Sequence, residues 1–133
     1  MTAVTGSTMA DIEDALAAID GYVESLGEAG RRVTSGEWGV TVEVEGWPLH
    51  VGLRLAGGLL GAQAMAVAPG RLEEWGLLRA NRPPGLVAFG LSASGEVWVR
   101  GVLPVAGASA VEVDRLLVEA VQAAGWARRQ SGR

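Results

Sequence analysis

The clearest structural pattern in the chain is Glu37-Trp-Gly-Val-Thr-Val-Glu-Val-Glu-Gly-Trp-Pro-Leu-His-Val-Gly-Leu-Arg-Leu55. Apolar residues occupy every second position on both sides of Gly46-Trp47-Pro48, namely Trp38, Val40, Val42 and Val44 before it and Leu49, Val51, Leu53 and Leu55 after it. A period of two is typical of a strand with one face buried, and glycine and proline mark the turn. The stretch therefore predicts an antiparallel β-hairpin.

Three further strands are predicted outward from this hairpin. Gly57-Gly58 turns the chain into a strand of small residues over Leu59–Val67, whose alternation is too weak to assign its faces. The turn Ser92-Ala-Ser-Gly95 joins the other two strands, over Leu86–Leu91 and Glu96–Leu103. The sheet is thus expected to contain about five strands.

Helices are predicted before, within and after these strands. An apolar stripe at helical spacing covers Met9–Leu26, and a short helix over Arg71–Asn81 ends at Pro83-Pro84-Gly85. Ser109-Ala-Val-Glu112 is a capping box that opens a last helix, which we expect to end at Gly125. The order α-β-β-β-α-β-β-α predicts a two-layer α+β fold, with the antiparallel sheet backed by helices.

Composition indicates one globular domain that is not an enzyme. The chain has 133 residues, 49% of them hydrophobic and 20% charged, which is enough for a core without disulfides or metal. Cysteine is absent and His50 is the only histidine, so one chain cannot assemble a thiol nucleophile, a catalytic triad or a histidine-rich metal site. We expect no catalytic, cofactor-binding or metal-binding residues.

Two other patterns resemble catalytic or ligand-binding sites but fit a structural role better. Glu43 and Glu45 are two apart and share a face of the predicted strand, but they alternate with valines as its solvated side. Gly57-Gly58-Leu-Leu-Gly61 lies between two antiparallel strands, whereas a phosphate loop precedes a helix. The N-terminus lacks a secretory signal and no apolar run is long enough to span a bilayer, which predicts a cytoplasmic location without membrane contact.

Tryptophan gives the strongest functional signal. If Val97, Val99 and Leu103 face the core, Trp98 points outward between Glu96 and Arg100. Val102 shares that parity, Trp47 lies in a turn and Trp126 follows the last helix, whereas Trp38 and Trp75 fit core stripes. Exposed apolar surface rich in tryptophan favours a protein interface, with Trp98, Val102, Trp47 and Arg100 as the predicted contact residues. A helix of the same chain could instead cover Trp98.

Single-stranded nucleic-acid binding is the alternative function. Trp98 beside Arg100 could stack on a base, and Arg128-Arg129 could contact phosphates. A net charge of -4 and a first helix with an acidic outer face argue against it. A small-molecule pocket in the sheet is a third possibility, without a residue that supports it.

The order of elements from about Met9 to Trp126 resembles the YbjN family. The short patterns that carry the resemblance are Leu77-Leu78-Arg79-Ala80-Asn81, Ser94-Gly95-Glu96-Val97-Trp98-Val99 and the capped last helix. The fold of that family is similar to that of class I type III secretion chaperones. The resemblance implies a single domain over 9–126 with flexible termini at 1–8 and 127–133, usually dimeric, which binds other proteins without enzymatic activity. We therefore expect a chaperone-like or adaptor homodimer that engages a cytoplasmic partner protein.

Overall fold

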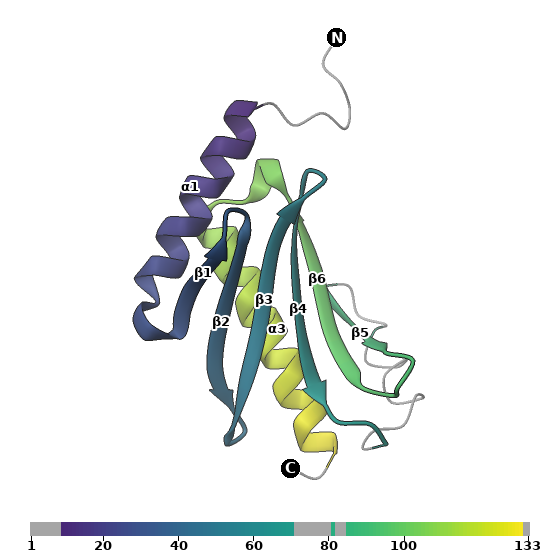
Figure 1. Ribbon diagram of the computed structural model, residues 1–133. Coiled ribbons are helices and arrows are strands. Elements are labelled where there is room, and N and C mark those ends of the chain that lie inside the picture. The colour runs from purple at the N-terminus through teal and green to yellow at the C-terminus, as the bar shows by residue number, and fades with distance from the viewer. Residues whose placement is uncertain (1–8, 71–80, 82–84, 132–133) are drawn as a thin grey trace.

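Six strands form one antiparallel sheet in the computed structural model of the chain, in the order β1-β2-β3-β4-β6-β5. The structure describes residues 9–70, 81 and 85–131. The elements are α1 (Met9–Ser25), a 3₁₀ turn η1 (Gly27–Ala29), β1 (Gly30–Thr34), β2 (Glu37–Val44), β3 (Trp47–Ala56), β4 (Leu59–Val67), β5 (Val87–Leu91), β6 (Val97–Pro104), a 3₁₀ turn η2 (Val105–Gly107) and α3 (Ala110–Gln130). The predicted α+β class with an antiparallel sheet and flanking helices is confirmed (Figure 1).

The hairpin β2–β3 has the predicted register and faces. Trp38 lies opposite Leu53, and Val42 lies opposite Leu49. Of these, Trp38, Leu49 and Leu53 are fully buried, because their parity points toward the helices. The sequence pattern of period two is therefore explained by one covered face.

β1 is a sixth strand that the sequence did not predict. It pairs with β2 at the edge of the sheet, and residues Arg31 to Thr34 are all exposed. A strand without a buried face needs no apolar alternation, so its sequence Gly-Arg-Arg-Val-Thr carries no strand signal.

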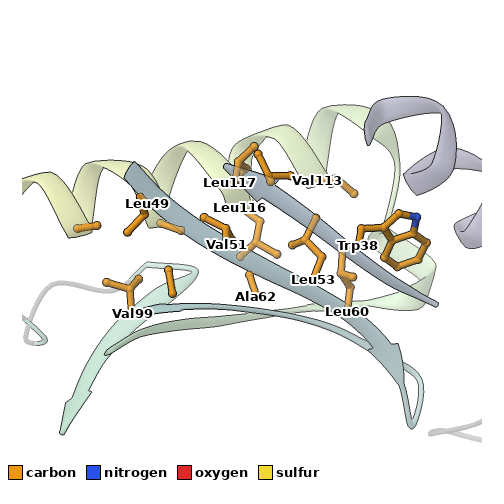
Figure 2. Packing of buried hydrophobic residues seen from close by; sticks show 14 of the residues in the cluster. Trp38, Leu49, Val51, Leu53, Leu60, Ala62, Val99, Val113, Leu116 and Leu117 are labelled. Atoms are coloured by element: carbon orange, nitrogen blue, oxygen red, sulfur yellow. The ribbon is translucent and has the colours of Figure 1, made fainter. Parts of the chain in front are cut away.

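The core lies between the sheet and α3. The buried residues of this helix are Val113, Leu116, Leu117, Ala120, Ala124 and Ala127, together with Gly125 and Arg128. They pack against inward side chains of the strands, among them Leu49, Val51, Leu53, Leu60, Ala62 and Val99 (Figure 2). Burial of this set supplies the main stabilisation of the fold.

α1 lies beside the sheet and is tied to both layers. Its buried residues are Ala15, Ile19 and Val23. Asp20 accepts a hydrogen bond from the Trp38 indole nitrogen at 2.7 Å, and the Tyr22 hydroxyl donates one to Asp114 of α3 at 2.8 Å. These two bonds fix α1 against β2 and α3.

α3 is longer than predicted. It does not end at Gly125 but continues to Gln130, so residues 127–130, which we expected in a flexible terminus, are helical. Gly125 is buried, and a Cβ atom there would lie 3.4 Å from Cγ1 of Val44. Glycine at this position therefore lets the helix approach β2, and the glycine that suggested a helix end has a packing role.

The predicted middle helix and the question of a membrane span concern the rest of the chain. The short helix over Arg71–Asn81, with Trp75, lies outside the described residues except for Asn81, whose side chain contacts the backbone of Phe89. Within residues 9–70 and 85–131, no helix is long and apolar enough to cross a membrane.

Candidate functional site

The face of the sheet that points away from α3 is called the outer face here. Its residues include Thr41 of β2, His50, Gly52 and Arg54 of β3, Leu59, Gly61, Gln63 and Met65 of β4, Gly90 of β5, and Trp98, Arg100 and Val102 of β6. In Figure 1 the sheet lies in front of α3, so the outer face is turned toward the viewer. Among the described residues no helix covers it.

Trp98 lies on the outer face, as its parity predicted. Val97, Val99 and Leu103 are buried, whereas Trp98 is half-buried between Met65 of β4 and Gly90 of β5. Its indole nitrogen donates a hydrogen bond of 3.4 Å to Glu96. α1 and α3 lie elsewhere, so neither of these helices covers Trp98.

Arg100 extends the Trp98 surface with a positive charge. Its guanidinium carbon lies 5.9 Å from the centre of the Trp98 ring, which is within the range of a cation–π contact. Arg100 itself is exposed. The two residues therefore present an aromatic plane and a cation side by side.

The first of two hollows is the Trp98 hollow, of about 450 Å³, which lies at the end of the sheet where the outer face meets the end of α3. Its lining includes Trp47, His50, Met65 and Trp98. Trp47 begins β3 and is 54% exposed. The structure thus brings two tryptophans that lie 51 positions apart in the chain to the same hollow, together with Met65.

Arg128 supports this hollow from below. It is only 6% exposed, and its guanidinium donates hydrogen bonds of 2.8 to 2.9 Å to four backbone carbonyl oxygens, those of Val44, Trp47, Pro48 and Ala66. Such a buried cation is tolerable because its donors are satisfied. Arg128 thereby joins the end of α3 to the β2–β3 turn and to β4.

The second hollow is the Val102 hollow, of about 620 Å³. Val102 is 54% exposed on β6, and Leu59 of β4 and Val33 of β1 are also exposed. Arg54 and Arg100 line the same hollow, and Gly52 and Gly61 contribute no side chain to it. The four predicted contact residues thus divide between two neighbouring hollows, with Arg100 beside both Trp98 and Val102.

The nucleic-acid hypothesis relied on a flexible tail that carries Arg128 and Arg129, whereas the structure places both residues in α3. Arg128 is buried and cannot reach a phosphate, so this part of the prediction is wrong. Arg129 pairs with Glu45 at 3.1 Å, and Trp126 packs on Phe89 with ring centres 5.4 Å apart. Trp98 and Arg100 are what remains of the proposed nucleic-acid surface.

No catalytic cluster emerges in the described part of the chain. His50 contacts the Thr41 hydroxyl through Nδ1 at 3.0 Å, and no group of three or more metal-ligating side chains is found there. Glu45 does not share a strand face with Glu43, because it lies in the turn with a positive φ of 52°. The two carboxylates are therefore not the pair considered from the sequence.

Met65 and Leu59 belong to this surface but were not predicted. Both are exposed on β4, a strand whose inward positions are filled by Leu60, Ala62 and Ala64. In β4 the small residues Ala62 and Ala64 face the core, whereas the larger Leu59 and Met65 face solvent. Hydrophobicity along the sequence therefore could not tell the buried face from the exposed one. Register against Trp98, which lies opposite Met65, settles the assignment.

Comparison with known proteins finds similarity in fold but not in sequence family. No protein-family model matches this chain, and no curated protein matches it significantly. It is similar in structure to a chain in the complex of the Yersinia pestis type III secretion chaperone SycH with a stable fragment of YscM2, with a TM-score of 0.59 and 17% identity over 83% of this chain and 96% of that one. It is also similar to a chain of the HopA1–SchA chaperone–effector complex, with a TM-score of 0.63 and 16% identity over 96% of this chain and 100% of that one. The fold thus resembles that of type III secretion chaperones.

Proposed function

We propose that this protein is a non-enzymatic protein-binding module, a chaperone-like or adaptor homodimer that engages a cytoplasmic partner protein through the outer face of its sheet. The observation that carries the proposal is the pair of open apolar hollows around Trp98 and Val102. No helix in the described part of the chain covers them.

The composition of this surface suits protein recognition. Trp47, Leu59, Met65 and Val102 are all exposed within the two hollows, and contiguous apolar surface of this kind is typical of interaction sites. Tryptophan and arginine are the residues most often found at the energetic centre of protein interfaces. Trp98 and Arg100 are therefore the proposed centre, with Val102 and Trp47 on either side.

The similarity in fold to type III secretion chaperones also supports a protein-binding role. One similar chain comes from a complex of a secretion chaperone with a protein fragment, and another from a chaperone–effector complex. Both similar chains thus come from an assembly with another protein, which supports a binding role for this chain.

The binding surface is tested by a pull-down with matched variants. Val102→Glu and Val118→Glu place the same charge on exposed valines, one on the outer face and one on α3, whose exposed fractions are 54% and 43%. We expect wild type and Val118→Glu to recover the same partners, and Val102→Glu and Trp98→Ala to lose them. Equal recovery by all four baits would remove the outer face as the binding surface.

The homodimer is tested separately by size-exclusion chromatography with light scattering. We expect wild type, Val102→Glu and Val118→Glu all to run as dimers, because the outer face is proposed for the partner and not for the second copy. A monomeric wild type would remove the homodimer. A dimer that only Val102→Glu dissociates would make the outer face the dimer interface and overturn its assignment to a partner.

A further inference from the structure

The charges around the Val102 hollow are opposite in sign to the protein as a whole. The chain carries a net charge of -4, but this hollow is lined by Arg54, Arg100 and one carboxylate, Glu37. Arg54 lies 3.7 Å from Glu37 in an exposed ion pair. Such a pair contributes little stability, so Arg54 can turn to another carboxylate at small cost.

Arg100 has no ion-pair partner among the described residues. Its contact there is the face of the Trp98 ring, which leaves its N–H donors available to a ligand. Gln63 lies directly opposite Arg100 on β4, so an amide and a guanidinium stand next to each other on the outer face. Both groups can donate hydrogen bonds to one carboxylate.

The floor beside these donors lacks side chains. Gly52 lies opposite Gln63, and Gly61 lies between Arg54 and Val102 in the next row of the sheet. A Cβ atom at Gly52 would come no closer than 3.9 Å to another atom, and one at Gly61 no closer than 3.8 Å. The fold therefore does not require glycine at either position.

Glycine within a strand lowers stability by about 0.5 to 1 kcal/mol relative to alanine. It commonly marks a place where a ligand or another chain approaches closely. Exposed Leu59 and Val102 stand beside this floor. Together these features describe an apolar depression flanked by the cationic side chains of Arg54 and Arg100.

We infer that the Val102 hollow binds a peptide segment of the partner that carries an acidic side chain next to an aliphatic one. The carboxylate lies against Arg100 and Gln63, and the aliphatic side chain lies on the glycine floor between Leu59 and Val102. This inference rests on the proposed function, because it specifies the chemistry of the partner at the same face.

The test selects dodecapeptides from a random displayed library on the immobilised full chain. Peptides whose binding is lost on Val102→Glu are synthesised with their acidic residue intact and with the matching amide. We expect the selected peptides to be rich in aspartate or glutamate next to aliphatic residues. The amide version is expected to bind about tenfold more weakly, as for the loss of a charge-assisted hydrogen bond.

Variants of the protein locate the effect. Arg100→Gln should weaken the acidic peptide about tenfold and abolish the difference between acid and amide, because the two changes remove the same contact. Gly52→Thr should block binding while leaving the fold intact, since its Cβ atom has room. Arg115→Gln, which removes an exposed arginine of α3, should change nothing.

Each contrary result has a distinct meaning. If acid and amide peptides bind equally well in a manner sensitive to Val102→Glu, the carboxylate inference is wrong and the protein-binding function stands. If binding depends on Trp98 but not on Val102, the partner uses the Trp98 hollow and this inference is wrong. If oligo-dT binds and Arg100→Gln abolishes that binding, the acidic ligand is nucleic acid and both proposals are wrong.

Discussion

The Nη1 atom of Arg128 lies 2.9 Å from the carbonyl oxygen of Trp47. Arg128, in the last turn of α3, thus hydrogen-bonds to the first residue of β3, which lies 81 positions earlier in the chain. The same guanidinium bonds to Pro48 and Val44, so it fixes the whole β2–β3 turn. The exposed Trp47 indole is presented from a turn whose backbone is fastened to the core.

Arg128→Lys is expected to lower the free energy of unfolding by about 3 kcal/mol. Lysine has no planar fork of donors, so several buried carbonyl oxygens would lose their partners at about 1 to 3 kcal/mol each. Urea denaturation followed by tryptophan fluorescence measures the change.

Arg129→Gln is the matched control for this prediction. Arg129 is exposed and pairs with Glu45 at the surface, where an ion pair contributes about 0 to 1 kcal/mol. If Arg128→Lys proved no more destabilising than Arg129→Gln, the four backbone bonds of Arg128 would not be holding the turn.

Gly101→Ala is expected to destabilise the fold by about 1 to 3 kcal/mol, through overpacking. Gly101 faces the core, and a Cβ atom there would lie 2.7 Å from the Leu86 carbonyl oxygen and 2.8 Å from Cδ1 of Leu116. Thermal unfolding measures the loss.

Gly61→Ala is the matched change on the other face of the sheet. It meets no such contact, so we expect unchanged stability or a gain of about 0.5 kcal/mol. Equal destabilisation by the two variants would mean that the fold itself needs glycine at position 61. The argument that a bound peptide explains this glycine would then be weaker.

Tyr22 is expected to resist ionisation in alkaline solution. Burial raises its pKa above the ordinary value of 10.0, and the hydrogen bond and negative charge of Asp114 raise it further. The unfolded chain loses this proton first, so the contribution to stability is complete below pH 10.0 and is lost as the pH rises toward the folded pKa.

The near-ultraviolet absorbance of tyrosinate reports this titration cleanly, because Tyr22 is the only tyrosine. Asp114→Asn should bring the pKa of Tyr22 part of the way back, since burial remains. An ordinary titration of Tyr22 in the folded wild type would show that α1 does not hold this side chain against α3.

Single-stranded oligonucleotides are expected to leave the tryptophan fluorescence unchanged at low salt. Arg128 is buried, Arg129 is paired, and α1 exposes Asp11, Glu13, Asp14 and Glu24 to solvent. Salt-sensitive quenching that Arg100→Gln removes would restore the nucleic-acid hypothesis.

Much of the fold follows from local patterns. The hairpin β2–β3 and the outward parity of Trp98 could be predicted because each strand has one buried face, and burial imposes a period of two. β1 could not be predicted, because an exposed edge strand has no such constraint. The end of α3 was misplaced because Gly125 serves close packing against Val44 instead of ending the helix.

The surface residues were only partly predictable. Trp98, Val102 and Arg100 stood out by their type and parity and Trp47 by its place in a turn, and each of the four lines one of the two hollows. Arg128 looked like a tail residue, since nothing in its neighbourhood of the sequence indicates carbonyl acceptors in distant strands. Gly52 and Gly61 carried no signal by themselves, because their meaning depends on what lies across the sheet.

Local patterns along the chain were enough for the α+β class, the main strands, the capped last helix and the outward position of Trp98, because each follows from one-face burial or local hydrogen bonding. Three relationships needed the folded chain: Trp47 and Trp98 line one hollow, Arg128 is buried under the β2–β3 turn, and Arg54 and Arg100 flank a glycine floor. Those relationships arise from strand order and register, which bring residues together across the sheet, and such pairings leave no periodic trace along the chain.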